Sequence, residues 1–121
     1  MRVIVCGGRN FNDVQFVLTK LDEFHANHPI TELIEGGATG VDAYASTWCA
    51  HKNIKHERVN AEWHIYKKSA GAIRNKAMLE MQPDMVIAFP GGPGTAHMKK
   101  IAYAEDIPVV EMNPEPKEIE K

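Results

Sequence analysis

Residues Met85–Thr95, which read MVIAFPGGPGT, decide the fold of this chain. Their first part, Met85–Phe89, is a continuous apolar run and predicts a strand buried on both faces of a parallel sheet. The run passes directly into the glycine-rich turn Pro90–Thr95, after which a helix is expected from Ala96 to about Glu105. A buried strand that leads through such a turn into a helix is the repeating unit of α/β folds.

The same order of strand, turn and helix recurs along the rest of the chain. It predicts one domain over residues 1–112, a Rossmann-like three-layer α/β sandwich in which helices cover both faces of a sheet of about five parallel strands. Residues 113–121 are rich in proline, glutamate and lysine and are expected to form a loose tail. Further strands are expected at Val3–Cys6, Thr31–Glu35, Ile54–Asn60 (nearer an edge) and Pro108–Met112. Helices are expected at Asn12–Asn27, around Val41–Cys49 and at Ala70–Met81, and irregular structure is expected at Ala61–Ser69.

Composition and charge exclude several classes of protein. With 121 residues, 44% hydrophobic and 25% charged, the chain has the size and balance of one ordinary soluble domain. Its net charge of -2 provides no broad positive field, so nucleic acid is not the expected partner. The sequence shows neither a secretion signal nor an apolar run of about 18 residues, so we expect a cytoplasmic protein with no membrane contact.

Cys6 and Cys49 lie far apart in apolar surroundings, without CxxC or Cys/His spacing. This arrangement is typical of buried free thiols in a reducing compartment. We therefore expect no metal and no cofactor.

Glycine clusters follow three of the predicted strands, at Gly7-Gly8, at Gly36-Gly37 and in the turn Pro90–Thr95. The carboxyl ends of parallel strands meet at one rim, so these clusters are expected to converge there. In the last cluster, backbone N–H groups, the positive end of the following helix and the Thr95 hydroxyl would form a cradle for an anion such as a phosphate. The alternative is a plain tight turn that uses glycine for its geometry.

Polar side chains near this rim are candidates for binding and catalysis. Arg9 and Arg74 could hold a phosphate, and Glu35 or Asp42 could bind ribose hydroxyls or act as a general base. Asp42 has an alternative role, because Thr39 and Asp42 have the spacing of a helix capping box. The candidate ligand-binding residues are Gly7, Gly8, Arg9, Gly36, Gly37, Thr39, Arg74, Asn75, Gly91, Gly92, Gly94 and Thr95, and the candidate catalytic residues are Glu35, Asp42 and Arg74.

Four further side chains have weaker cases. His64 and His97 could exchange protons, although a lone histidine in such positions is more often simply exposed. Trp63 and Tyr66 could stack on a base, and packing explains aromatic residues there equally well.

Taken together, the motifs resemble the SLOG superfamily, a Rossmann-like group that includes the lonely-guy phosphoribohydrolases and the DNA-processing protein of transformation. The likeness is greatest to its small YspA-like branch and spans about Met1–Met112. The residues that carry it are Gly7-Gly8-Arg9 with Phe11, Glu35-Gly36-Gly37-Ala38 with Gly40 and Asp42, Ala70-Gly71 with Arg74-Asn75 and Met78, and Phe89-Pro90-Gly91-Gly92 with Gly94-Thr95.

The resemblance implies phosphate binding more strongly than catalysis. Lonely-guy enzymes hydrolyse the N-glycosidic bond of a nucleoside monophosphate, and their PGGxGTxxE motif ends in a glutamate. Met98 occupies that last position here, and a thioether cannot act as a carboxylate does. Arg74 and Met78 match the arginine and methionine of the family's other motif.

Two functions therefore stay open. The first is a ligand-binding or sensor domain for a nucleotide-derived small molecule, held by the loops after the first, second and fourth strands. The second is a hydrolase of N-glycosidic bonds, with Arg74 on the phosphate and Glu35 or Asp42 near the ribose. DNA binding is a weaker third idea. Relatives often pair through helices, and in a homodimer of this chain Tyr44, Trp48 or Trp63 would face the partner if exposed.

Overall fold

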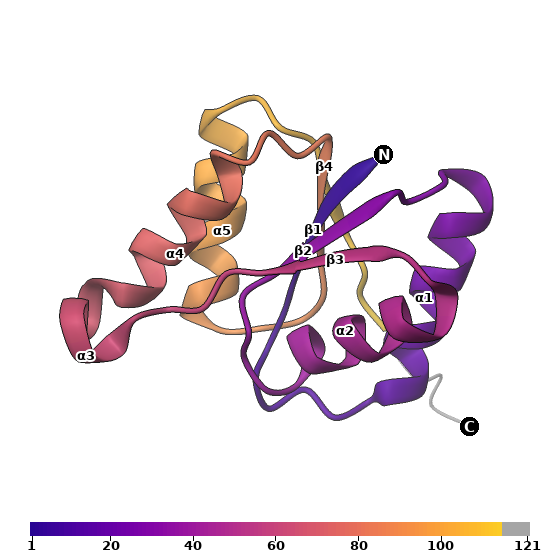
Figure 1. Cartoon of the computed structure of the whole chain (residues 1–121), viewed down its shortest axis with the longest axis horizontal. Helices are drawn as coiled ribbons and strands as arrows, with labels where there is room; N and C mark the ends of the chain where they lie inside the picture. Colours follow the sequence, from indigo (N-terminus) through magenta and orange to yellow (C-terminus); the bar gives the residue numbers. More distant parts are fainter. Residues whose placement is uncertain (115–121) are drawn as a thin grey trace, which may run out of the picture.

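The computed structural model describes residues 1–114, which fold around one parallel sheet. Its five strands lie in the order β3-β2-β1-β4-β5, so the first strand of the chain lies in the middle (Figure 1). This layout confirms the expected Rossmann-like α/β fold. The strands are β1 (Arg2–Cys6), β2 (Glu32–Glu35), β3 (Lys55–Arg58), β4 (Met85–Ala88) and β5 (Val109–Glu111).

The amino-acid pattern explains where each strand lies in the sheet. β1 is covered on both faces, because Val3, Ile4 and Val5 are fully buried, and it pairs with both β2 and β4. β3 lies at the edge, where Lys55 and Arg58 are exposed, as its low hydrophobicity predicts.

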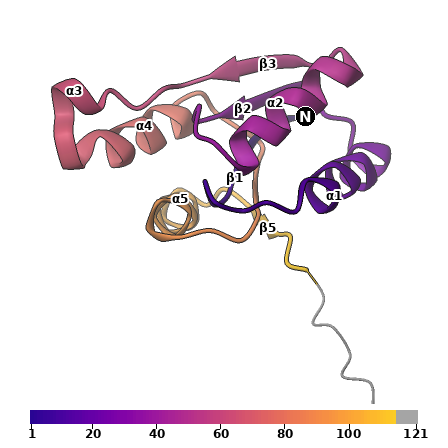
Figure 2. The same cartoon turned by 90° about the horizontal axis from the view of Figure 1, so that it is seen from below.

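One layer of helices packs on each face of the sheet (Figure 1, Figure 2). α1 and α2 share a core with the sheet that includes Val17 and Trp48, and α4 and α5 cover the other face through Met78 and Met98. α3 and the 3-10 turn η1 lie at the far end of α4, away from α1 (Figure 2). The helical elements are α1 (Val14–Asn27), α2 (Val41–Lys52), α3 (Trp63–Tyr66), η1 (Lys67–Ser69), α4 (Ala70–Leu79) and α5 (Pro93–Ala104).

Several element boundaries differ from the expected ones. α5 begins at Pro93 and not at Ala96, since a proline suits the first helical position, where its missing N–H costs nothing. α4 ends at Leu79, and the segment expected to be irregular holds α3 and η1. Of the expected tail, residues 115–121 lie outside the described part of the chain.

One candidate for a contact with a partner subunit is excluded by its burial. Trp48, named as a residue that could face a partner subunit, is 2% exposed and donates a hydrogen bond from its indole to Asp22. Both free cysteines, Cys6 and Cys49, are buried as predicted.

The strand order decides where a ligand can enter. From β1 the chain moves outward to β2 and β3, and it then returns to the other side of β1 through β4 and β5. The loops that leave β1 and β4 therefore diverge to opposite faces and open a crevice at the carboxyl ends of these neighbouring strands, which is the usual ligand site of such sheets. No helix within residues 1–114 has the length and hydrophobicity needed to cross a membrane.

Candidate functional site

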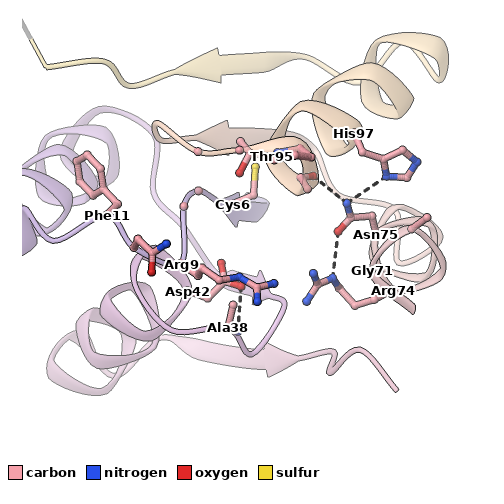
Figure 3. A pocket seen from close by; sticks show the side chains of 18 of the residues that line it. Cys6, Arg9, Phe11, Ala38, Asp42, Gly71, Arg74, Asn75, Thr95 and His97 are labelled. Carbon is pink, nitrogen blue, oxygen red and sulfur yellow. Dashed lines mark hydrogen bonds between the residues drawn. The ribbon is translucent and has the colours of Figure 1, made fainter. Parts of the chain in front are cut away.

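A cavity of about 850 Å³ opens at the carboxyl ends of β1 and β4 (Figure 3). Its walls come from the β1–α1 loop, the start of α2, the segment α3–α4 and the start of α5, and its volume is within the range of small-molecule sites. Most of the candidate residues meet here although they are far apart in sequence. Those that line this cavity are Gly7, Gly8, Arg9, Asp42, Arg74, Asn75, Gly91, Gly92, Gly94 and Thr95.

A smaller cavity of about 280 Å³ adjoins the first, and Gly36, Gly37 and Thr39 line it. The two cavities share part of their walls, namely Arg9, Ala38, Trp63 and Arg74. Glu35 lines neither cavity. The three glycine clusters therefore lie on one rim but divide between two compartments.

The loop between β4 and α5 leaves its backbone donors free. Within residues 1–114, no hydrogen bond uses the amides of Gly92, Gly94 and Thr95 or the Thr95 hydroxyl. A side chain at Gly92 or Gly94 would meet no atom within 4 Å, so these positions border open space. These unpaired donors at a helix N-terminus have the geometry of an anion cradle.

Gly91 has a different role in the same loop. A Cβ atom at Gly91 would collide with the Thr95 hydroxyl and would lie 2.8 Å from the amide nitrogen of Gly8. The two loops approach this closely because the Gly8 amide donates to the Pro90 carbonyl at 2.8 Å. Glycine at position 91 thus lets the β1 and β4 loops meet below the free amides.

In the β2–α2 loop, by contrast, the backbone amides already donate hydrogen bonds to carboxylates of the protein. The amides of Gly36 and Ala38 each donate to Asp42 at 3.2 Å, and the amide of Gly37 donates to Glu35. These amides already donate to carboxylates of the protein, so this loop offers fewer free donors to a ligand than the β4–α5 loop does. The expected capping box is wrong, because Gly40 is the N-cap and the Thr39 hydroxyl donates to the Arg9 carbonyl.

Glu35 is fully buried in a charged cluster beside the edge strand. Its carboxylate lies 2.6 Å from His56 Nε2 and accepts a hydrogen bond from Arg58 Nε at 2.9 Å. Because it lines no cavity, the structure gives Glu35 a role in fixing the loop and leaves it out of reach of a ligand in either compartment.

Asp42 is the one carboxylate among residues 1–114 that lines either cavity. Burial raises its pKa from 3.8 to about 6, against the lowering effect of the hydrogen bond from Ala38. Figure 3 shows Asp42 on the side of the cavity opposite Thr95. An acid with this pKa can exchange a proton near neutral pH, which makes Asp42 the stronger of the two acidic candidates.

A chain of hydrogen bonds orients the basic side of the cavity (Figure 3). Arg74 donates from Nη1 to the Gly36 carbonyl at 2.5 Å and from Nε to the Asn75 side-chain oxygen at 3.1 Å. The Asn75 amide nitrogen is then directed to the Gly94 carbonyl, 3.1 Å away, and to His97 Nδ1, 3.2 Å away. Asn75 therefore joins α4 to the first turn of α5 and fixes Arg74 at the cavity wall.

Three cations line the larger cavity against the single carboxylate of Asp42. They are Arg9, Lys68 and Arg74, and within residues 1–114 none of them forms a salt bridge. Lys68 was not among the predicted site residues, because an exposed lysine in a polar segment carries no signal of its own.

The aromatic and histidine candidates differ in whether they line a cavity. Trp63 lines both cavities, and Phe11 lines the larger one. Tyr66 and His64 line neither cavity. His97 lines the larger cavity and contacts the Asn75 side chain.

Two kinds of chemistry find no support in the described residues. Cys6 lines the cavity, but burial, and next the nearby Asp42 charge, raise the pKa of its thiol to about 12, so it is not a thiolate nucleophile. No group of three histidine, cysteine, aspartate or glutamate side chains within residues 1–114 could hold a metal ion.

The fold and the crevice define a Rossmann-like α/β domain with a ligand cavity at its switch point. The chain belongs to the YspA, cpYpsA-related SLOG family, whose model matches residues 1–66. It is also 32% identical to the Gene 61 protein of Mycobacterium phage D29 over 123 residues, an alignment that covers 95% of this chain and 98% of that protein. No solved structure matches the chain. The SLOG resemblance inferred from the motifs is thus confirmed, and membership of this superfamily indicates binding or processing of a nucleotide-related ligand.

Proposed function

We propose that this protein binds a nucleotide-derived molecule in the larger cavity, with a phosphate of the ligand on the amides that precede and begin α5. The observation that carries the proposal is the set of unpaired donors at Gly92, Gly94 and Thr95 beside open space. Arg74, held by Asn75, lies across the cavity from this loop and would neutralise the same phosphate (Figure 3).

Binding without turnover is the function that the cavity favours. Met98, which stands where lonely-guy enzymes have their glutamate, is fully buried in the core between α5 and the sheet. The remaining acid, Asp42, already accepts two backbone hydrogen bonds through one of its oxygens. Glycoside hydrolysis ordinarily uses a pair of carboxyl groups, and no second carboxylate among residues 1–114 lines the cavity.

Hydrolysis of an N-glycosidic bond is kept as a second candidate because of one observation. The raised pKa of Asp42, about 6, suits a general acid or base at neutral pH. In this alternative Asp42 would act at the ribose while Arg74 holds the phosphate.

One experiment tests the proposal and separates the two candidates. The protein is incubated with AMP and with NAD, its thermal unfolding is followed, and the mixture is analysed by chromatography for free base. We expect the ligand to raise the melting temperature and to be recovered intact. Released base would favour hydrolysis, and it should then disappear in Asp42→Asn.

A matched pair of variants ties the effect to the α5 loop. Thr95→Val removes the hydroxyl at the cavity, whereas Thr47→Val removes one on the exposed face of α2. We expect the ligand-induced shift to fall in Thr95→Val and to persist in Thr47→Val. An equal response of the two variants, or no shift with either nucleotide in the unmodified protein, would contradict the proposed site.

A further inference from the structure

The larger cavity has an aromatic side chain at each of two opposite ends. Phe11 lies on the β1–α1 loop, where its ring also packs edge-on against Phe16 at 6.2 Å between centroids. The other aromatic residue, Trp63, reaches the cavity near Gly71, since a Cβ built at Gly71 would lie 3.5 Å from the tip of the Trp63 ring. Figure 3 shows Phe11 and Gly71 on opposite sides of the cavity.

The groups that attract anions lie between these two ends. Thr95 and Arg9 occupy the middle of the view in Figure 3, and the Arg74 guanidinium points toward this region from the side of Gly71. Counting Lys68, the lining carries three cations and one carboxylate, in a chain whose net charge is -2. A local excess of positive charge in an acidic protein favours a ligand with more than one negative charge at its centre.

Trp63 also has a surface available for stacking. It is 49% exposed although it is the largest apolar side chain on α3, and it lines both the larger and the smaller cavity. Aromatic faces of this kind stack on bases of any identity.

We propose that the ligand class is a pyrophosphate-bridged molecule with a ring system at each end, as in a dinucleotide. One ring would stack at Trp63, the other would pack at Phe11, and the pyrophosphate would lie between them against the α5 loop, Arg9 and Arg74. This inference rests on the proposed function and adds the size and the two-ended character of the ligand. A mononucleotide would leave one aromatic end and part of the positive charge without a counterpart.

The test compares AMP, ADP and NAD as probes, with affinities measured by calorimetry on the full chain. Phe11→Leu and Trp63→Leu each remove one aromatic ring while keeping an apolar side chain. Tyr66→Leu is the matched control, because Tyr66 is an exposed aromatic residue of α3 that lines neither cavity. Melting temperatures without ligand verify that each variant is folded.

We expect NAD to bind at least about tenfold more tightly than AMP, with ADP between them. Each of Phe11→Leu and Trp63→Leu should weaken NAD binding by about fivefold or more, as expected for the loss of one stacked ring. AMP binding should respond to only one of these two substitutions, and Tyr66→Leu should change neither ligand.

Three results would overturn the inference. If AMP binds and NAD binds no more tightly, the two-ended ligand is wrong while the proposed phosphate site stands. If NAD is insensitive to either ring substitution, that end of the cavity does not hold a ring. If neither AMP, ADP nor NAD binds at all, the inference falls together with the proposed function.

Discussion

At the scale of single residues, three glycines of one loop carry different constraints. Gly92 and Gly94 border open space, whereas a Cβ atom at Gly91 would collide with the Thr95 hydroxyl and the Gly8 backbone. The sequence PGGPGT predicted a glycine-dependent loop, but it could not distinguish these positions, since the difference depends on what the β1 loop places beside them.

Gly94→Ala should separate ligand binding from stability. Its methyl group would project into open space in the first turn of α5, so the fold should be kept and stabilised by up to about 1 kcal/mol. The same methyl group narrows the approach to the free amides, and ligand affinity should fall about tenfold, or about 1.4 kcal/mol. Thermal unfolding and calorimetry with the same nucleotide measure the two effects.

Gly91→Ala is the contrasting variant. Its methyl group has no room beside Thr95 and Gly8, and we expect a loss of about 1–3 kcal/mol in unfolding free energy even without ligand. If Gly94→Ala binds the nucleotide as well as the unmodified protein does, the free amides are not the phosphate site.

Asp42 should leave a signature in the pH dependence of stability. Burial raises its pKa from 3.8 to about 6, so the folded chain holds this proton more tightly than the unfolded chain does. The unfolded state ionises first as the pH rises, and Asp42 therefore lowers the free energy of unfolding by about 3 kcal/mol between about pH 4 and pH 6. Below and above this window its contribution is constant.

Chemical denaturation of the unmodified protein and of Asp42→Asn across pH 4 to 7 isolates this effect. The difference in unfolding free energy between the two proteins should change within that window in the direction that favours the variant at higher pH. A difference that stays constant with pH would show that Asp42 is not held in a buried, proton-retaining environment.

At the scale of elements, the β2–α2 loop is held between two buried carboxylates. Glu35 binds the Gly37 amide and Asp42 binds the amides of Gly36 and Ala38, while the Gly36 carbonyl accepts from Arg74. The loop thus connects a charged cluster at the edge of the sheet to an arginine of the cavity wall. The sequence identified the two acids but not their partners, because His56 and Arg58 come from a strand whose register cannot be read from its short, weakly hydrophobic pattern.

Glu35→Ala should therefore affect both stability and binding. It leaves the Gly37 amide without its acceptor and removes the partner of Arg58 and His56, with an expected cost of about 2 kcal/mol in unfolding free energy. Ligand affinity should fall because Arg74 loses its fixed position. The matched control is Glu62→Ala, an exposed acid that lines neither cavity, and it should leave both quantities unchanged.

If Glu35→Ala unfolds as the unmodified protein does, the cluster does not support the loop. If stability falls while the affinity for the nucleotide is unchanged, the loop does not position Arg74. Urea denaturation and calorimetry provide the two measurements.

At the scale of the whole molecule, the alternation of strands and helices was enough to predict the layers, the parallel sheet and the Rossmann-like class. The division of the rim into two cavities was not predictable, because it depends on α3 and η1, a segment of exposed residues without hydrophobic periodicity. Trp63 and Lys68 reach the cavity from this segment, so one of its two aromatic ends and one of its three cations depend on tertiary structure that local pattern does not encode.

The core also constrains any attempt to introduce at position 98 the glutamate that lonely-guy enzymes have there. Met98 is fully buried in the same core cluster as Ile4 and Met78. Met98→Glu would bury a carboxyl group without a partner and should destabilise the fold by about 3 kcal/mol or more. Circular dichroism and a chromatographic assay for released base should show a less stable protein that has gained no hydrolysis; a stable variant that releases base would contradict this account of α5.

In the proposed complex, the amides at the start of α5, and not those of the β2–α2 loop, receive the phosphate of the ligand. Amide chemical shifts of the ¹⁵N-labelled protein, followed during titration with ADP, test this most directly. We expect the largest changes at Gly91, Gly92, Gly94 and Thr95, and small changes at Gly36–Ala38, whose amides already donate hydrogen bonds to Glu35 and Asp42. Changes concentrated at Gly36–Ala38, with the α5 loop unaffected, would contradict this expectation.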